Sequence, residues 1–129
     1  MDLPQSDMVY LNERGVPHHI ASESNMTCVL MPNWSLPSGF DRDVSDLLIR
    51  LNPGYPDVPP DMWWFSPAVH LRSGQALPAT SVVETHLGRN WQRWSRHFTN
   101  GQWQSGIDGL ESFLALIRQD LARSVSGVN

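Results

Sequence analysis

Apolar residues in the C-terminal part of the chain recur as they do on one face of an α-helix. The stripe consists of Ile107, Leu110, Phe113, Leu114, Ile117 and Leu121. This spacing (i, i+3, i+6, i+7, i+10, i+14) predicts an amphipathic helix that continues to about Arg123. Ser105 and Asp108 resemble a capping box at its start. A shorter helix is predicted over residues 6–14, because Ser6 or Asp7 can cap it and Gly15 can end it.

Three stretches are rich in Val, Leu, Ile or aromatic residues and predict β-strands: residues 25–31 (NMTCVLM), 43–51 (DVSDLLIRL) and 62–65 (MWWF). Pro32 is expected to close the first of these strands. Residues 71–90 show no period and predict a long loop. Strands that follow one another through short links indicate an antiparallel meander, so the predicted fold is α+β, with the helices on one side of a small sheet.

A proline-rich crossing separates the second and third predicted strands. Residues 52–60 contain four of the ten prolines of the chain, together with Gly54. Proline fixes φ and removes a backbone donor, so this segment is expected to be a stiff, extended connector rather than a helix or an inner strand. The four prolines are Pro53, Pro56, Pro59 and Pro60.

The composition limits the possible functions. The 129 residues are enough for one domain (residues 1–129), and the net charge of −4 gives no electrostatic basis for binding nucleic acid or an anionic membrane. The single cysteine, Cys28, fits a reducing compartment, and neither a signal peptide nor a stretch of about 20 apolar residues is visible. The expectation is a soluble, cytoplasmic protein without a cofactor.

The proline crossing carries a motif that resembles a known family. Tyr55-Pro56-x-x-Pro59-Pro60 is followed by an apolar strand, by His70 and, farther on, by Trp103 with a helix behind it. This order of motifs is similar to that of the ubiquitin-conjugating-enzyme (UBC) superfamily. The amino-acid sequence of residues 36–64 most resembles its bacterial branch, prokaryotic family E. The resemblance covers about residues 25–122. It implies a UBC-like fold, with a ubiquitin-like protein and its activating enzyme as partners.

The resemblance also implies a catalytic cysteine, which this sequence lacks. No cysteine follows Cys28, and the family's His-Pro-Asn element reads His70-Leu71-Arg72. Counting back from Trp103, the cysteine position falls near Ser95, and His97 could serve it as a general base, giving an oxyester in place of a thioester. A UBC-like histidine such as His70 would brace the active loop. The alternative interpretation is a catalytically inactive module that only binds its partners.

Arginines alternate with tryptophans in residues 88–98 (GRNWQRWSRHF). One interpretation places Trp91 and Trp94 on a shared buried side, with the arginines as a solvated rim. A second makes Arg93, Arg96 and Trp94 a partner-binding surface, since arginine pairs well with carboxylates. A lesser hypothesis is a metal site formed by His70, His86 and His97, although their spacing follows no known ligand pattern.

Overall fold

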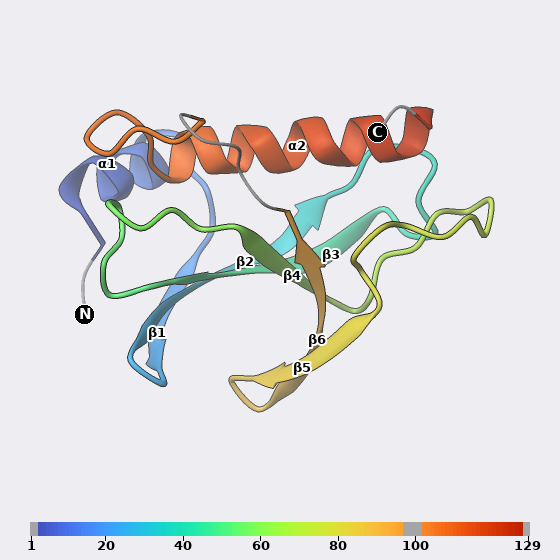
Figure 1. The fold of residues 1–129 in the computed structure, drawn as a ribbon, viewed down its shortest axis with the longest axis horizontal. Coiled ribbons are helices and arrows are strands. Elements are labelled where there is room, and N and C mark those ends of the chain that lie inside the picture. Colours follow the sequence, from blue (N-terminus) through green and yellow to red (C-terminus); the bar gives the residue numbers. More distant parts are fainter. Residues whose placement is uncertain (1–2, 97–101, 128–129) are drawn as a thin grey trace.

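The computed structural model describes residues 3–96 and 102–127, in which two helices cover one face of a six-stranded antiparallel sheet (Figure 1). The strand order in the sheet is β1-β2-β3-β4-β6-β5. The α+β class and the helices on one side are confirmed. The elements are α1 (Gln5–Glu13), β1 (His19–Glu23), β2 (Met26–Ser35), β3 (Val44–Leu51), β4 (Met62–Ser66), β5 (Val82–His86), β6 (Arg89–Ser95) and α2 (Leu110–Ser126).

The main core lies between α2 and the sheet. Alternate residues of β3 face the helices, as Leu47, Ile49 and Leu51 do, and all three are buried. Trp63 and Trp94 stack beneath α2 with their ring centroids 5.9 Å apart. The predicted apolar stripe meets this layer, because Phe113, Leu114, Ile117 and Leu121 are buried.

The predicted end of the first strand at Pro32 is wrong. β2 continues to Ser35 through an irregularity between Met31 and Trp34, where the register against β3 shifts by one residue. A bulge of this kind leaves residues out of the ladder, so a proline without an N–H fits there. In the bulge, Asn33 adopts a positive φ of 52° and donates its N–H to Asp46 Oδ1.

The predicted loop over residues 71–90 is also wrong in its second half. β5 and the start of β6 form a hairpin there, turning through Leu87 and Gly88, which both have positive φ. A further strand, β1, occupies His19–Glu23, which none of the predicted strands includes. The sequence predicted none of β1, β5 and β6 as strands. β1 and β5 lie at the sheet's edges and are mostly exposed, so their sequences carry no clear apolar alternation. β6 lies inside the sheet, between β4 and β5, and its buried residues face both cores.

α2 begins later than predicted. Its first residue is Leu110, and Ile107 lies outside it with 78% of its surface exposed. The Asp108 carboxylate accepts the N–H of Gln104 in the preceding turn, so Ser105 and Asp108 do not form the cap. Gly109 precedes the helix instead, and its N–H donates to the Ser112 hydroxyl at 3.0 Å.

A second, smaller core lies on the opposite face of the sheet and consists of Cys28, Leu48, Trp64 and Trp91. Trp91 and Trp94 are both buried, but they belong to different cores, because β6 is a strand and residues three apart point to opposite faces. The predicted shared side of these two rings is therefore wrong.

The sheet curls around the second core. Glu23 at the end of β1 accepts the N–H of Leu87 in the β5–β6 turn at 2.8 Å, although β1 and β5 are the outermost strands. The β1–β2 and β5–β6 hairpins accordingly project on the same side, away from α2 (Figure 1). Neither helix in the described part of the chain is long and apolar enough to cross a membrane.

Candidate functional site

Ser95 is the last residue of β6 and its backbone is held from both sides. It pairs with Met62 on β4, and its N–H donates to the carbonyl of Ala79 at 3.1 Å. Alternation along β6 places its side chain on the face of Arg93 and Trp91, away from the helices. The residue is half-buried, and its hydroxyl makes no hydrogen bond within the described ranges. A nucleophile at this position would therefore be fixed by its backbone.

The structure does not bring Ser95 and His70 together. Ser95 lies beside Met62 at the first end of β4, whereas His70 comes after Ser66 at the other end, and these two ends of the strand are roughly 13 Å apart. His97, the predicted general base, lies outside the described residues. Any base for Ser95 therefore has to come from a residue other than His70.

His70 braces its loop through its backbone rather than its ring. Its N–H donates to Asp41 Oδ1 at 3.1 Å, and its carbonyl accepts the Asp41 N–H at 2.8 Å. The residue is exposed. This clamp joins the segment after β4 to the segment before β3, which is a structural role.

Cys28 lies in β2 within the second core and is fully buried. Its neighbours there are Leu48, Trp64 and Trp91. A thiol without access to solvent cannot meet the activated C-terminus of another protein. The structure therefore places the only cysteine as a packing residue.

The arginines of β6 already have carboxylate partners within the chain. Arg93 pairs with Glu84 at 2.8 Å, and Arg96 pairs with Asp120 of α2 at 3.0 Å. Trp94 is fully buried beneath α2, with the Arg96 guanidinium 5.2 Å from its ring centroid. Arg93 thus lies on the face away from the helices and Arg96 on the helix face, so the structure does not bring the two arginines together, and Trp94 itself is covered.

Within residues 3–96 and 102–127, no group of three His, Cys, Asp or Glu side chains is placed to hold a metal ion. Both ring nitrogens of His86 face carboxylates, with Nε2 3.0 Å from Glu84 and Nδ1 3.4 Å from Glu23. The set of His70, His86 and His97 includes one residue beyond the described ranges, so it stays a prediction.

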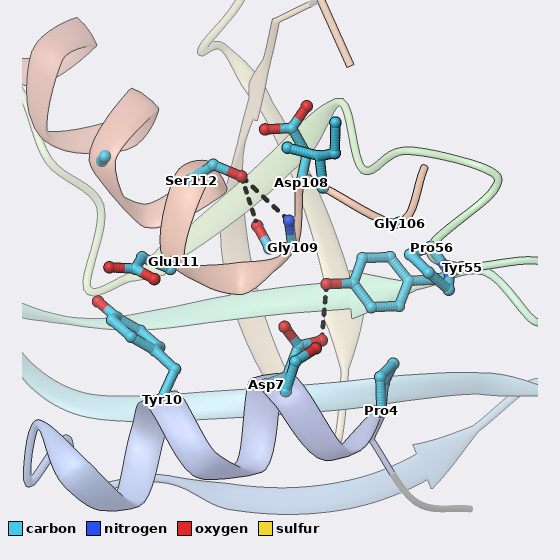
Figure 2. Close-up of a pocket in the computed structure, with 13 residues that line it drawn as sticks. Pro4, Asp7, Tyr10, Tyr55, Pro56, Gly106, Asp108, Gly109, Glu111 and Ser112 are labelled. Carbon is cyan, nitrogen blue, oxygen red and sulfur yellow. Dashed lines mark hydrogen bonds between the residues drawn. The ribbon is translucent and has the colours of Figure 1, made fainter. Parts of the chain in front are cut away.

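The proline crossing forms a pocket of about 320 Å³ with α1 and the start of α2 (Figure 2). Its centre is Asp7, which is buried and accepts the Tyr55 hydroxyl at 2.7 Å. The other Asp7 oxygen accepts the N–H of Leu110 at 3.0 Å, in the first turn of α2. A carboxylate at this position also complements the positive end of the helix dipole. The sequence indicated Asp7 only as a cap for α1.

Two further bonds tie the crossing to the segment before α2. The Trp103 indole N–H donates to the carbonyl of Pro56 at 2.8 Å, and the Ser105 hydroxyl donates to Asp57. Burial, and then the Asp7 carboxylate, raise the pKa of the Tyr55 phenol, so this group remains a proton donor. Tyr55 therefore does not act as a general base in this pocket, and the hydrogen bonds around it hold the proline crossing to α1 and α2.

A family model described as Prokaryotic E2 family E matches residues 3–124. This confirms the resemblance found in the YPxxPP element and extends it over nearly the whole chain. No curated protein and no solved structure matches the chain significantly.

Proposed function

Because the chain belongs to Prokaryotic E2 family E, we propose that it engages a ubiquitin-like protein and the enzyme that activates that protein. The observation that carries the proposal is the match over residues 3–124, which includes α1, the strands β1 to β6 and all but the last two residues of α2. The family's YPxxPP element is also fixed in place, by Asp7 on Tyr55 and by Trp103 on Pro56.

In the first form of the proposal, Ser95 accepts the C-terminus of the ubiquitin-like protein. The hydroxyl oxygen attacks the activated carbonyl, and the bond from that carbonyl to its leaving group (a nucleotide phosphate or a thiolate of the activating enzyme) breaks. The serine proton passes to a base, for which His97 is the candidate. The product is an oxyester. What supports Ser95 is its position at the end of β6, with its backbone held by Met62 and Ala79.

In the second form, the protein binds these partners without forming a covalent bond. Two observations favour this form: Cys28 is buried, and His70 lies at the far end of β4 from Ser95. The chain would then hold a ubiquitin-like protein or its activating enzyme as a scaffold.

One experiment separates the two forms. The protein is incubated with ATP, the activating enzyme and the ubiquitin-like protein from the same genome, and adducts are resolved with and without thiol reductant and mild alkali. The first form predicts an adduct that survives the reductant and is cleaved by alkali. Ser95→Ala abolishes it, whereas the matched control Ser81→Ala, at an exposed serine before β5, retains it.

The composition makes the adduct easy to interpret. All nine cationic side chains are arginine, so the chain has no lysine to form an isopeptide bond. An alkali-resistant adduct would therefore point to the amino terminus and contradict Ser95. An ester mapped to Thr80, Ser81 or Thr85 would keep the chemistry but refute the residue. Absence of any adduct, with binding that survives Ser95→Ala, supports the scaffold, and absence of both adduct and binding contradicts the proposal.

A further inference from the structure

A second pocket, of about 410 Å³, lies on another part of the molecule. It is formed where the turn between α1 and β1, the bulge of β2 and one residue of α2 meet. None of the YPxxPP residues and none of the β6 residues borders it. Its lining residues are Arg14, Gly15, Val16, Pro17, Met31, Pro32, Asn33, Trp34, Ser35 and Arg118.

The charge of this pocket is unusual for the chain. Its lining includes two arginines and no carboxylate, although the protein carries a net charge of −4. Arg118 forms no ion pair with any carboxylate in the described ranges. Arg14 reaches Glu111 only at 3.6 Å, with about two thirds of each side chain exposed, and such a pair contributes little. Both guanidinium groups are therefore available to an anion.

Trp34 provides an independent reason to expect a ligand. The residue is only 8% exposed, and its indole Nε1–H is buried without a hydrogen-bond partner among the described residues. A buried donor of this kind normally has an acceptor, because leaving it unpaired is unfavourable. The Arg118 guanidinium lies 4.7 Å from the Trp34 ring centroid, and Arg118 is an exposed residue that can move aside.

Apart from the arginines, Trp34 and the polar residues Asn33 and Ser35, the lining of the pocket is mainly apolar. Val16 and Pro17 come from the α1–β1 turn, and Met31 and Pro32 come from β2. Small-molecule sites commonly combine an apolar lining with a few polar groups that fix the ligand's orientation. This pocket has that composition, with cationic and N–H donors but no acidic group.

A third pocket, on the other face of the sheet, does not have arginines available to an anion. It is lined by Arg50 and Arg93, but each arginine pairs with a glutamate, Glu23 or Glu84. Its positive charge is therefore compensated within the protein. The pocket of Arg14 and Arg118 is the better candidate for an anion.

We propose that the pocket between the α1–β1 turn, the β2 bulge and α2 binds a small organic anion, a carboxylate or phosphate joined to an apolar group. The anionic oxygens contact Arg118 and Arg14, since guanidinium pairs well with both headgroups. An oxygen also accepts the Trp34 indole N–H once the Arg118 side chain shifts. The apolar group packs on Val16, Pro17 and Pro32. This site does not depend on Ser95.

The test is a titration of the full chain, labelled with ¹⁵N, followed by the indole N–H resonances. Benzoate and phenyl phosphate are the two anionic probes, and they distinguish the carboxylate from the phosphate headgroup. Benzyl alcohol supplies the ring without charge, and inorganic phosphate supplies charge without the ring. Saturable shifts of the Trp34 indole and of the Arg118 Nε–H are expected with at least one anionic probe, weakening as salt is added.

Two variants of α2 with the same change of charge complete the test. Arg118→Gln should weaken binding about tenfold or more, because it removes a charge-assisted contact. Arg123→Gln, at an exposed arginine that does not border the pocket, should leave binding unchanged. The proposal is overturned if no probe gives a saturable shift of the Trp34 indole. It is equally overturned if both variants weaken binding to the same extent, or if inorganic phosphate or benzyl alcohol binds as tightly as the anionic probes.

Discussion

At the scale of single residues, Asp7 connects three segments that lie far apart in the sequence. Its two carboxylate oxygens accept from Tyr55, 48 residues away, and from Leu110, 103 residues away. The short helix α1 is thereby fixed against both the proline crossing and the start of α2. No local pattern could have indicated this role, because an acidic residue in the first turn of a helix is common for reasons internal to that helix.

The first prediction concerns the Tyr55 hydroxyl. Tyr55→Phe should destabilise the protein by about 1–3 kcal/mol, because the buried Asp7 carboxylate loses a donor. Tyr55→Ala should cost about 3 kcal/mol, since packing against Trp103 is lost as well. Urea unfolding measures both changes. Tyr10→Phe borders the same pocket and serves as the control, because the Tyr10 hydroxyl makes no bond to Asp7. Equal stability of Tyr55→Phe and the parent would contradict the role given to Asp7.

The second prediction is that Cys28 is dispensable for any activity. Cys28→Ala removes one buried sulfur from the second core and should cost about 1 kcal/mol of stability. Adduct formation and partner binding should both be unchanged. These are measured in the same assays as for Ser95→Ala. If Cys28→Ala alone abolished transfer, the thiol would have to be exposed during the reaction and the choice of Ser95 would be wrong.

At the scale of elements, the sequence predicts those whose apolar residues or capping signals follow a clear local pattern. β3 and α2 carry strong apolar patterns because each lies on the main core. β1 and β5 were not predicted, because edge strands need only backbone pairing and their side chains are largely exposed. β6 was not predicted either, because its two buried tryptophans, Trp91 and Trp94, belong to different cores and polar residues separate them. The choice of Ser95 as a candidate came from the family resemblance, whereas the pairing of Arg96 with Asp120 requires the three-dimensional fold.

The third prediction concerns Glu84, which joins β5 to β6 through Arg93 and to β4 through Trp64. Partial burial raises its pKa, but hydrogen bonds from His86, Trp64 and Arg93 outweigh this and lower the pKa overall from the usual 4.5. A lowered carboxyl pKa means that the stabilisation is present above pH 4.5 and is lost as the pH falls below it through the folded-state pKa. Wild type should therefore lose stability as the pH falls below about 4.5.

Glu84→Gln tests this dependence, because it removes the titrating group while keeping the shape. Urea midpoints are measured at pH 7 and at pH 3.5 for both proteins. The variant should be less stable than wild type at pH 7, and the difference should shrink at pH 3.5. A difference that is constant between the two pH values would show that the Glu84 charge does not stabilise the hairpin.

The fourth prediction concerns the entry to α2. A Cβ added at Gly109 would lie 2.6 Å from Asp7 Oδ1, so Gly109→Ala should displace that carboxylate and destabilise by about 1–3 kcal/mol. In an Asp7→Ala background the same substitution should cost much less, since the obstructing group is gone. Additive effects in this double-mutant cycle, measured by urea unfolding, would mean that Gly109 and Asp7 do not interact.

At the scale of the whole molecule, the curled sheet replaces a second layer of helices. The main core is covered by α1 and α2, but Cys28, Leu48, Trp64 and Trp91 lie on the uncovered face. Closing the two outer hairpins toward each other encloses this second core. Glu23 holds them by accepting from Leu87, with Arg50 and His86 within 3.5 Å.

The last prediction is that Glu23 couples the two edges of the sheet. Glu23→Ala removes the acceptor of the Leu87 N–H and one partner of both Arg50 and His86. If the edges hold each other, amide hydrogen exchange should accelerate about tenfold or more in the β1–β2 hairpin and in the β5–β6 turn together, although the turn lies 64 residues farther along the chain. Exchange in α2 should be unaffected. Glu13→Ala, which removes the same charge from the exposed end of α1, is the matched control and should leave both hairpins protected. Acceleration at β1 alone would mean that each hairpin is stable independently, and that packing of Trp64 and Trp91 alone maintains the curl.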